Sequence, residues 1–153
     1  MTDLTPLLDL IERLRAPDGC PWDRGQSLVD VRAYLLEEAH EAAAAIDAGD
    51  RQELARELGD LLFQVCFVLV LAREEGAFEP AAVIEGIRAK MIARHPHVFG
   101  GEQLADAEAV SRAWERRKLG EREGRGLLEG VAPSLPALLA AYRMTQKAAA
   151  VGF

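Results

Sequence analysis

The sequence predicts an all-α protein, and three observations support this prediction. Apolar side chains recur at helical spacing along most of the chain. No segment shows the strict apolar–polar alternation that is typical of a strand. Glycine and proline occur where the helical pattern breaks. Since 50% of the 153 residues are apolar and 28% are charged, we expect a single globular domain over residues 1–153.

The first two predicted helices end at recognisable signals. The first spans Leu4 to Leu14 and stops in a loop rich in proline and glycine. Ser27 is a suitable N-cap for the second helix, which runs to about residue 48. Gly49 then ends that helix, and Asp50 can cap the next one. A tight connection between two antiparallel helices is therefore expected at this point.

The third predicted helix runs from about residue 51 to residue 75, so the predicted hairpin covers residues 27–75. Its second half, Leu61 to Leu71, is apolar on nearly all sides. Such a segment requires burial on several faces, in a bundle core or at a subunit interface. We therefore expect a four-helix-bundle core with additional terminal helices, assembled as a homodimer or a dimer of dimers.

Three further helices complete the predicted fold. One spans about residues 80–94, with Pro80 in its first turn and His95-Pro96 after its end. Another spans about residues 105–121 and precedes a glycine-rich break. The last has Pro136 in its first turn and reaches about residue 150.

Charge and hydropathy exclude several classes of function. The net charge of −7 argues against binding to duplex nucleic acid, which requires a basic face. The longest uncharged apolar stretch, residues 61–72, is too short to span a bilayer. The first ten residues lack the basic segment of a secretory signal. We therefore expect a cytoplasmic protein that binds neither nucleic acid nor membrane.

Four carboxylates are placed symmetrically about Gly49. Glu41 lies eight residues before this glycine and Glu57 eight after, whereas Glu38 lies eleven before and Asp60 eleven after. In an antiparallel hairpin these pairs fall at matching heights, about 12 to 16 Å from the turn. Residues three apart also share a helix face. The spacing therefore predicts one square of carboxylates.

Such a square is unfavourable without a cation, because like charges at contact distance raise each other's pKa. Ligands that are all oxygen favour Mg²⁺, for which Mn²⁺ can substitute, over zinc. Magnesium usually completes its coordination with the phosphates of a substrate. The four acids therefore predict a site for a phosphorylated ligand.

These residues resemble the MazG-type all-α nucleoside triphosphate pyrophosphohydrolases. The signature of that family is EExxE followed after a gap by ExxD. It corresponds here to Glu37-Glu38-x-x-Glu41 and Glu57-x-x-Asp60. Further similar segments extend over nearly the whole chain: residues 19–23, 94–99, 114–118 and 135–138. Larger family members carry two such modules, and the chain resembles the N-terminal one, as a natural single module or an excised half.

The resemblance implies magnesium-dependent hydrolysis of nucleoside triphosphates between the α and β phosphates, giving a nucleoside monophosphate and pyrophosphate. This activity would serve to clean or regulate the nucleotide pool. By the same resemblance, the metal ligands are Glu38, Glu41, Glu57 and Asp60. Glu37 is expected to lie behind the ligands or to orient and deprotonate the attacking water.

Five residues are expected to contact the nucleotide, and each has a structural alternative. Lys90 and Arg94 share a helix face and can clamp phosphates, although basic residues also suit a helix C-terminus. Lys118 can reach a phosphate beside Trp114, although this pair could instead be a solvated lysine and a core tryptophan. Trp22 can stack on the base or merely close the edge of the core.

Two other functions remain open from the sequence. A di-iron or di-manganese carboxylate bundle needs two Glu-x-x-His motifs, of which only Glu37-x-x-His40 is present. A non-catalytic dimerisation or regulatory module would leave the four acids solvated.

Overall fold

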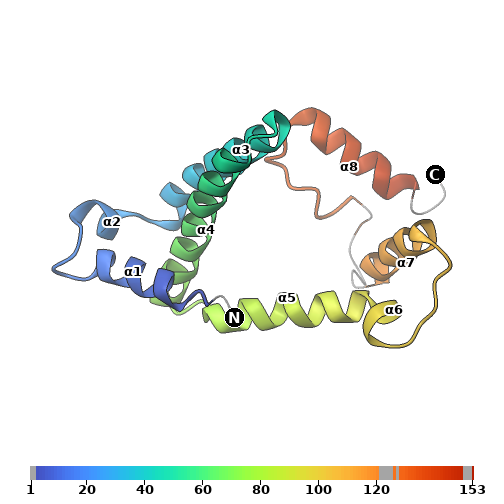
Figure 1. The fold of residues 1–153 in the computed structure, drawn as a ribbon, viewed down its shortest axis with the longest axis horizontal. Helices are drawn as coiled ribbons and strands as arrows, with labels where there is room; N and C mark the ends of the chain where they lie inside the picture. Colours follow the sequence, from blue (N-terminus) through green and yellow to red (C-terminus); the bar gives the residue numbers. More distant parts are fainter. Residues whose placement is uncertain (1–2, 121–125, 127, 150–152) are drawn as a thin grey trace. The chain divides into compact units, whose positions relative to one another are not determined.

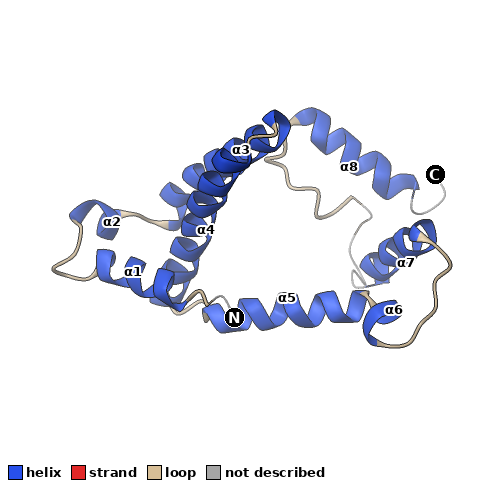
Figure 2. Ribbon diagram, viewed as in Figure 1, coloured by secondary structure: helices blue, strands red, loops and turns tan. Residues whose placement is uncertain are grey.

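The computed structural model describes residues 3–120, 126, 128–149 and 153. Every regular element in this part of the chain is an α-helix, which confirms the all-α prediction (Figures 1 and 2). In chain order the helices are α1 (Thr5–Arg15), α2 (Pro21–Gly25), α3 (Leu28–Ala48), α4 (Arg51–Glu74), α5 (Pro80–Arg94), α6 (Pro96–Phe99), α7 (Ala107–Gly120) and α8 (Ala137–Ala149). None of the described helices has the length and apolar character needed to cross a membrane.

The chain divides into two compact units, residues 1–86 and residues 87–153, with the boundary inside α5. The first unit contains the hairpin of α3 and α4, with α1 packed against α4 and α2 packed against α1. The second contains the end of α5 together with α6, α7 and α8.

Helix α3 begins with a reciprocal cap. The Ser27 hydroxyl accepts a hydrogen bond from the amide of Asp30 at 3.4 Å, and the Asp30 carboxylate accepts one from the amide of Ser27 at 2.9 Å. These bonds satisfy amides that have no partner within the helix. The predicted N-cap is therefore confirmed.

The turn between α3 and α4 is formed by two residues. Gly49 adopts φ +69°, the left-handed conformation that glycine tolerates best. The Asp50 carboxylate accepts hydrogen bonds from the amides of Gln52 and Glu53, both at 3.0 Å. Because one residue ends α3 and the next starts α4, the helices fold back side by side (Figure 1).

The core of the first unit lies where α1, α3 and α4 meet. Its fully buried members come from all three helices: Ile11, Val31, Cys66, Phe67, Val70 and Leu71. Partly buried leucines of α1 pack against them. The apolar half of α4 is buried on all sides from Leu69 to Ala72, whereas Leu62 and Val65, nearer its middle, remain 40% and 41% exposed.

Two short helices, α2 and α6, lie in segments where the sequence predicts no helix. Each has a proline at its N-terminal end, and they contain five and four residues. An isolated helix of one turn is unstable, because the conformational entropy lost in forming the first turn outweighs the free energy gained from its hydrogen bonds. Their stability therefore depends on contacts with residues remote in sequence, and local pattern alone does not reveal it.

Candidate metal and nucleotide site

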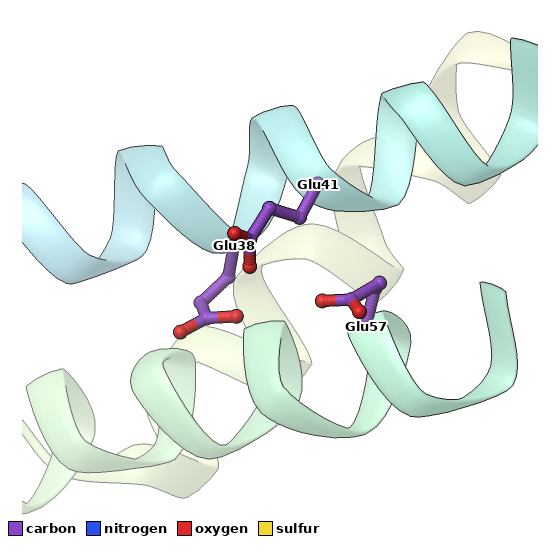
Figure 3. A group of neighbouring side chains, drawn as sticks. All are labelled: Glu38, Glu41 and Glu57. Atoms are coloured by element: carbon purple, nitrogen blue, oxygen red, sulfur yellow. The ribbon is translucent and has the colours of Figure 1, made fainter. Parts of the chain in front are cut away.

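Three carboxylates converge between α3 and α4. Glu38 and Glu41 extend from α3 toward Glu57 on α4 (Figure 3). One oxygen from each lies within 4.8 Å of the other two. Glu38 and Glu57 are half-buried, whereas Glu41 is exposed. We name Glu38, Glu41 and Glu57 the carboxylate cluster.

Charge repulsion acts within the carboxylate cluster. Burial, followed by the charge of Asp60 and then those of Glu41 and Glu57, raises the pKa of Glu38 above its usual range. Although Glu41 is exposed, partial loss of hydration and then the charge of Glu57 likewise raise its pKa. A positive ligand placed among these oxygens would remove this cost.

Asp60 lies one turn after Glu57 on α4 and is exposed. Its charge acts on Glu38 more strongly than that of any other residue, so it belongs to the same acidic field. The structure does not bring its oxygens into the 4.8 Å group formed by the carboxylate cluster. Of the four acids expected to form a square, three therefore converge and the fourth stands beside them.

The carboxylate cluster fits a hard divalent cation. Its donors are all carboxylate oxygens, which favour Mg²⁺ or Mn²⁺ over softer metals. The raised pKa values of Glu38 and Glu41 indicate negative charge that a cation would neutralise. The cluster thus has both the donor chemistry and the electrostatic need for a metal ion.

Glu37 and His40 lie on α3 and are both exposed. Neither contributes a ligand atom to the cluster found among the described residues. Glu37 does add to the negative charge felt by Glu38 and Glu41. A histidine ligand, which a di-iron bundle requires, is therefore absent from this cluster.

A small apolar cavity of about 80 Å³ lies near the cluster, toward the open end of the hairpin. Its lining comes from α2, α3 and α4 and from the residue after α2: Trp22, Gln26, Val31, Tyr34, Phe63, Gln64 and Phe67. The Trp22 and Tyr34 rings lie 6.0 Å apart. Tyr34 is one helical turn from Glu38, and Gln64 is one turn from Asp60. The lining of the cavity therefore continues along both helices from the acids.

The expected phosphate contacts belong to the second unit. Arg94 is only 9% exposed, and its guanidinium lies over the Trp114 ring at 5.0 Å. The ring of His95 also lies 5.0 Å from Trp114. Lys118 forms an ion pair with Glu115 at 3.0 Å, whereas Lys90 is exposed. Within their unit, the Arg94 guanidinium packs against the Trp114 ring.

Sequence reasoning missed Tyr34 and Gln64 as members of the cavity. Gln64 offered a signal, because it is the one uncharged polar side chain in the apolar stretch 61–72. Tyr34 offered none, since an aromatic residue on an amphipathic helix usually belongs to the core. Both are half-buried where they line the cavity.

Comparison with known proteins finds similarity to one family of enzymes. Residues 26–99 match the MazG nucleotide pyrophosphohydrolase domain. The whole chain is 40% identical to the nucleoside triphosphate pyrophosphohydrolase of Escherichia coli K12 over 157 aligned residues, which is 60% of that protein. It is 40% identical over 96% of its length to the nucleoside triphosphate pyrophosphohydrolase/pyrophosphatase MazG of Thermotoga maritima, covering 57% of that protein. The protein from Mycobacterium tuberculosis with the same name as that of E. coli is 30% identical over 97% of the chain and 46% of its own length.

The chain spans about 60% of the length of the E. coli relative. The matched segment, residues 26–99, includes all three members of the carboxylate cluster and most residues that line the apolar cavity. Residues 26–99 thus carry the match to the MazG nucleotide pyrophosphohydrolase domain, and the chain as a whole is similar to nucleoside triphosphate pyrophosphohydrolases.

Proposed function

We propose that the protein is a magnesium-dependent hydrolase that cleaves nucleoside triphosphates between the α and β phosphates, with the hairpin 27–75 as the catalytic part of a single module. The observation that carries this proposal is the convergence of Glu38, Glu41 and Glu57 within 4.8 Å across the hairpin. The names of the relatives from E. coli and T. maritima support the same reaction class.

Glu38, Glu41 and Glu57 would hold the cation, with Asp60 completing the set. When bound, Mg²⁺ or Mn²⁺ would supply Lewis acidity, neutralise phosphate charge and lower the pKa of a water molecule. Glu37 would orient the attacking water and accept its proton, since it is exposed beside the cluster on the same helix. The products would be a nucleoside monophosphate and pyrophosphate.

The apolar cavity would receive the base of the nucleotide. Trp22 and Tyr34 supply aromatic faces, and the amide of Gln64 supplies one donor and one acceptor for the base edge. Lys90, Arg94, Lys118 and Trp114 are proposed as phosphate and nucleotide contacts on the basis of the family resemblance. Arg94 and Lys118 would first have to exchange their present partners.

We further propose that two hairpins combine into a four-helix bundle, in a homodimer or a dimer of dimers. Leu58, Leu62 and Val65 follow one another at helical spacing along α4 and are 49%, 40% and 41% exposed. A continuous apolar stripe of this kind is typical of the seam between packed helices.

The test is pyrophosphate release from a panel of nucleoside triphosphates, with Mg²⁺ and with EDTA. We expect release only with the metal. Glu38→Gln and Asp60→Asn should each lower kcat at least about a hundredfold, which is typical for loss of a group that acts in the transition state. Glu75→Gln is the matched control, because Glu75 is an exposed acid at the end of α4. Unchanged activity in Glu38→Gln, or activity in EDTA, would contradict the proposal.

A further inference from the structure

Arg15, the last residue of α1, is almost completely buried. Only 9% of its side chain is exposed, although arginine usually lies at the surface. A buried guanidinium is costly unless its charge is paired and its N–H groups are hydrogen-bonded. Its partners therefore indicate what the residue holds in place.

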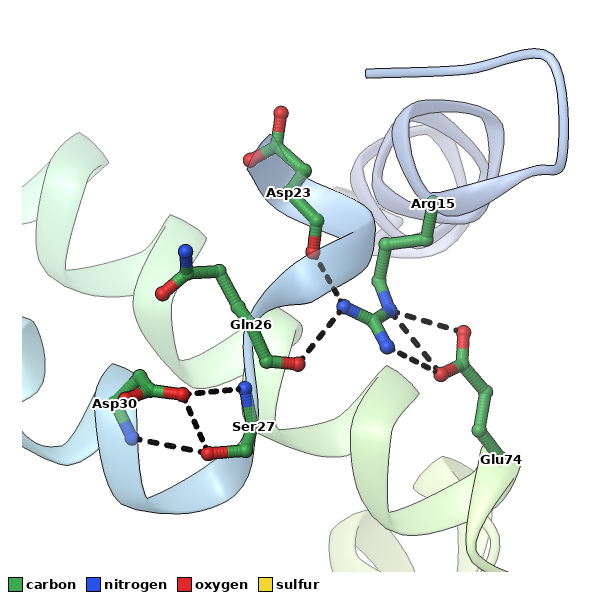
Figure 4. Close-up of polar contacts among 6 residues, drawn as sticks. All are labelled: Arg15, Asp23, Gln26, Ser27, Asp30 and Glu74. Carbon is green, nitrogen blue, oxygen red and sulfur yellow. Dashed lines mark hydrogen bonds and ion pairs between the residues drawn. The ribbon is translucent and has the colours of Figure 1, made fainter. Parts of the chain in front are cut away.

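The Arg15 guanidinium joins two separate parts of the first unit (Figure 4). Nε and Nη2 donate to both oxygens of the Glu74 carboxylate near the end of α4, at 2.7 to 3.1 Å. Nη1 donates to the backbone carbonyl of Asp23 and, at 3.2 Å, to that of Gln26. The guanidinium also lies over the Phe67 ring at 5.4 Å. One side chain thus ties the C-terminal end of α2 to α4.

Helix α2 is too short to form on its own, with only five residues. The two carbonyls that accept hydrogen bonds from Arg15 lie at the C-terminal end of α2, where a positive charge also interacts favourably with the helix dipole. Trp22 belongs to this helix and forms one wall of the apolar cavity beside Tyr34, with the two ring centroids 6.0 Å apart. The position of the Trp22 ring therefore depends on the contacts of Arg15.

We infer that Arg15 is a positioning residue for base recognition. It contacts two residues that line the cavity, through the Gln26 carbonyl and the Phe67 ring, and through α2 it fixes the wall that would stack on the base. This inference rests on the proposed function. Arginine is required because its planar fork satisfies a bidentate carboxylate and two carbonyls at once, whereas the compact ammonium of lysine cannot.

The test compares binding of two ligands to the full chain in Mg²⁺, by calorimetry. One ligand is a non-hydrolysable α,β-methylene nucleoside triphosphate, and the other is inorganic tripolyphosphate, which has no base. Arg15→Lys should weaken binding of the nucleotide by about three- to tenfold, which is a fraction of the loss expected for removing a stacked aromatic ring. Tripolyphosphate affinity should stay within twofold. Glu74→Gln should also lower the affinity for the nucleotide.

Glu12→Gln is the matched control, since Glu12 pairs with Arg73 and also joins α1 to α4, but touches no part of α2. It should leave nucleotide affinity unchanged. In a Trp22→Ala background, Arg15→Lys should cause no further loss of affinity, because the wall that Arg15 positions is already absent. If the role of Arg15 were purely structural, Arg15→Lys would instead weaken binding of both ligands, or its effect would add to that of Trp22→Ala.

The possible results distinguish the positioning role of Arg15 from the proposed function. If wild-type protein binds the nucleotide and Arg15→Lys binds it equally well, only the positioning role is overturned. If wild-type protein binds the nucleotide no better than tripolyphosphate, base recognition at the cavity is wrong and so is the role of Arg15. If neither ligand binds in the presence of Mg²⁺, the proposed function itself fails.

Discussion

Glu38 is the residue on which the electrostatics of the carboxylate cluster converge. It is half-buried between two helices, and four neighbouring acids raise its pKa in addition to burial. A folded chain without a cation therefore carries an energetic cost at this position. The same cost makes the cluster sensitive to metal binding, which gives a test that needs no substrate.

Glu38→Gln should stabilise the protein in EDTA and abolish its stabilisation by Mg²⁺. Removing one like charge should raise the melting temperature of the metal-free protein by roughly 1–3 °C, the range expected for a partly solvated pair. At a Mg²⁺ concentration about ten times the Kd, the melting temperature of the wild-type protein should rise by roughly 3–6 °C, and that of the variant should not change. Differential scanning fluorimetry measures both quantities, with Glu75→Gln behaving as wild type. A metal-free variant less stable than wild type would contradict the electrostatic interpretation.

The stabilisation by Mg²⁺ should depend on pH in a defined direction. Because the pKa of Glu38 is raised in the folded state, this carboxyl keeps its proton to a higher pH when folded than when unfolded. Its ionisation therefore lowers stability as the pH rises from the ordinary carboxyl range toward neutrality. Mg²⁺ should therefore offset a larger electrostatic destabilisation at neutral pH than in mild acid. Melting temperatures with and without Mg²⁺ across that range should diverge as the pH increases.

Gly19 illustrates a constraint that the sequence pattern conceals. A Cβ atom at this position would lie 2.3 Å from the carbonyl oxygen of Leu14 and 2.5 Å from that of Arg13. These oxygens belong to the end of α1, where the loop folds back and Cys20 donates to the Leu14 carbonyl at 2.7 Å. Gly19 could be recognised from the sequence as a loop residue, but this close approach depends on tertiary structure.

Gly19→Ala should destabilise the protein by roughly 1–3 kcal/mol, the usual cost of forcing an extra methyl group into a packed site. The backbone must shift because the nearest atoms are themselves backbone. Urea denaturation followed by circular dichroism measures the change. Gly25→Ala is the control, since a Cβ atom there meets nothing within 4 Å. Equal stability of the two variants would show that the loop moves freely away from α1.

At the scale of elements, helix boundaries were predictable where capping is local. Ser27, Gly49 and Asp50 mark the limits of the hairpin in the sequence, and the structure places α3 and α4 between them. Helix α2 was not predictable, because its end is held by Arg15 and its position by α1. Arg15 is in turn held by Glu74, which lies 59 residues away in the sequence. Local signals specify caps, whereas contacts of this range emerge only from the packed fold.

Asp50→Ala should lower the free energy of unfolding by about 1 kcal/mol, the typical cost of losing an N-cap. Two hydrogen bonds to backbone amides at 3.0 Å would be lost, and these amides have no partner inside α4. Asp50→Ser should retain most of the stability because a hydroxyl can accept the same bonds. Asp47→Ala is the control, since an acid near the C-terminus of α3 gains nothing from the helix dipole. Urea denaturation distinguishes these variants.

At the scale of the whole molecule, the sequence predicted the meeting of three of the four acids but not how the core is built. The spacing about Gly49 was sufficient to bring Glu38, Glu41 and Glu57 together, because one hairpin controls all three. The contribution of Ile11 from α1 to the core could not be derived, since helix periodicity does not say which helices pack together. The apolar face of α4 was evident in the sequence, and in the single chain part of it remains uncovered.

The stripe of Leu58, Leu62 and Val65 leads to a prediction about assembly. If a second copy covers it, Leu62→Lys should raise the dissociation constant of the oligomer at least about tenfold, because it buries an unpaired charge at the seam. Sedimentation equilibrium should show wild-type dimers or tetramers and a shift of the variant toward monomer, with unchanged helical circular dichroism. Val29→Lys is the control, since Val29 is 66% exposed on α3 outside the stripe. A wild-type protein that stays monomeric at tens of micromolar would rule out the bundle formed by two hairpins.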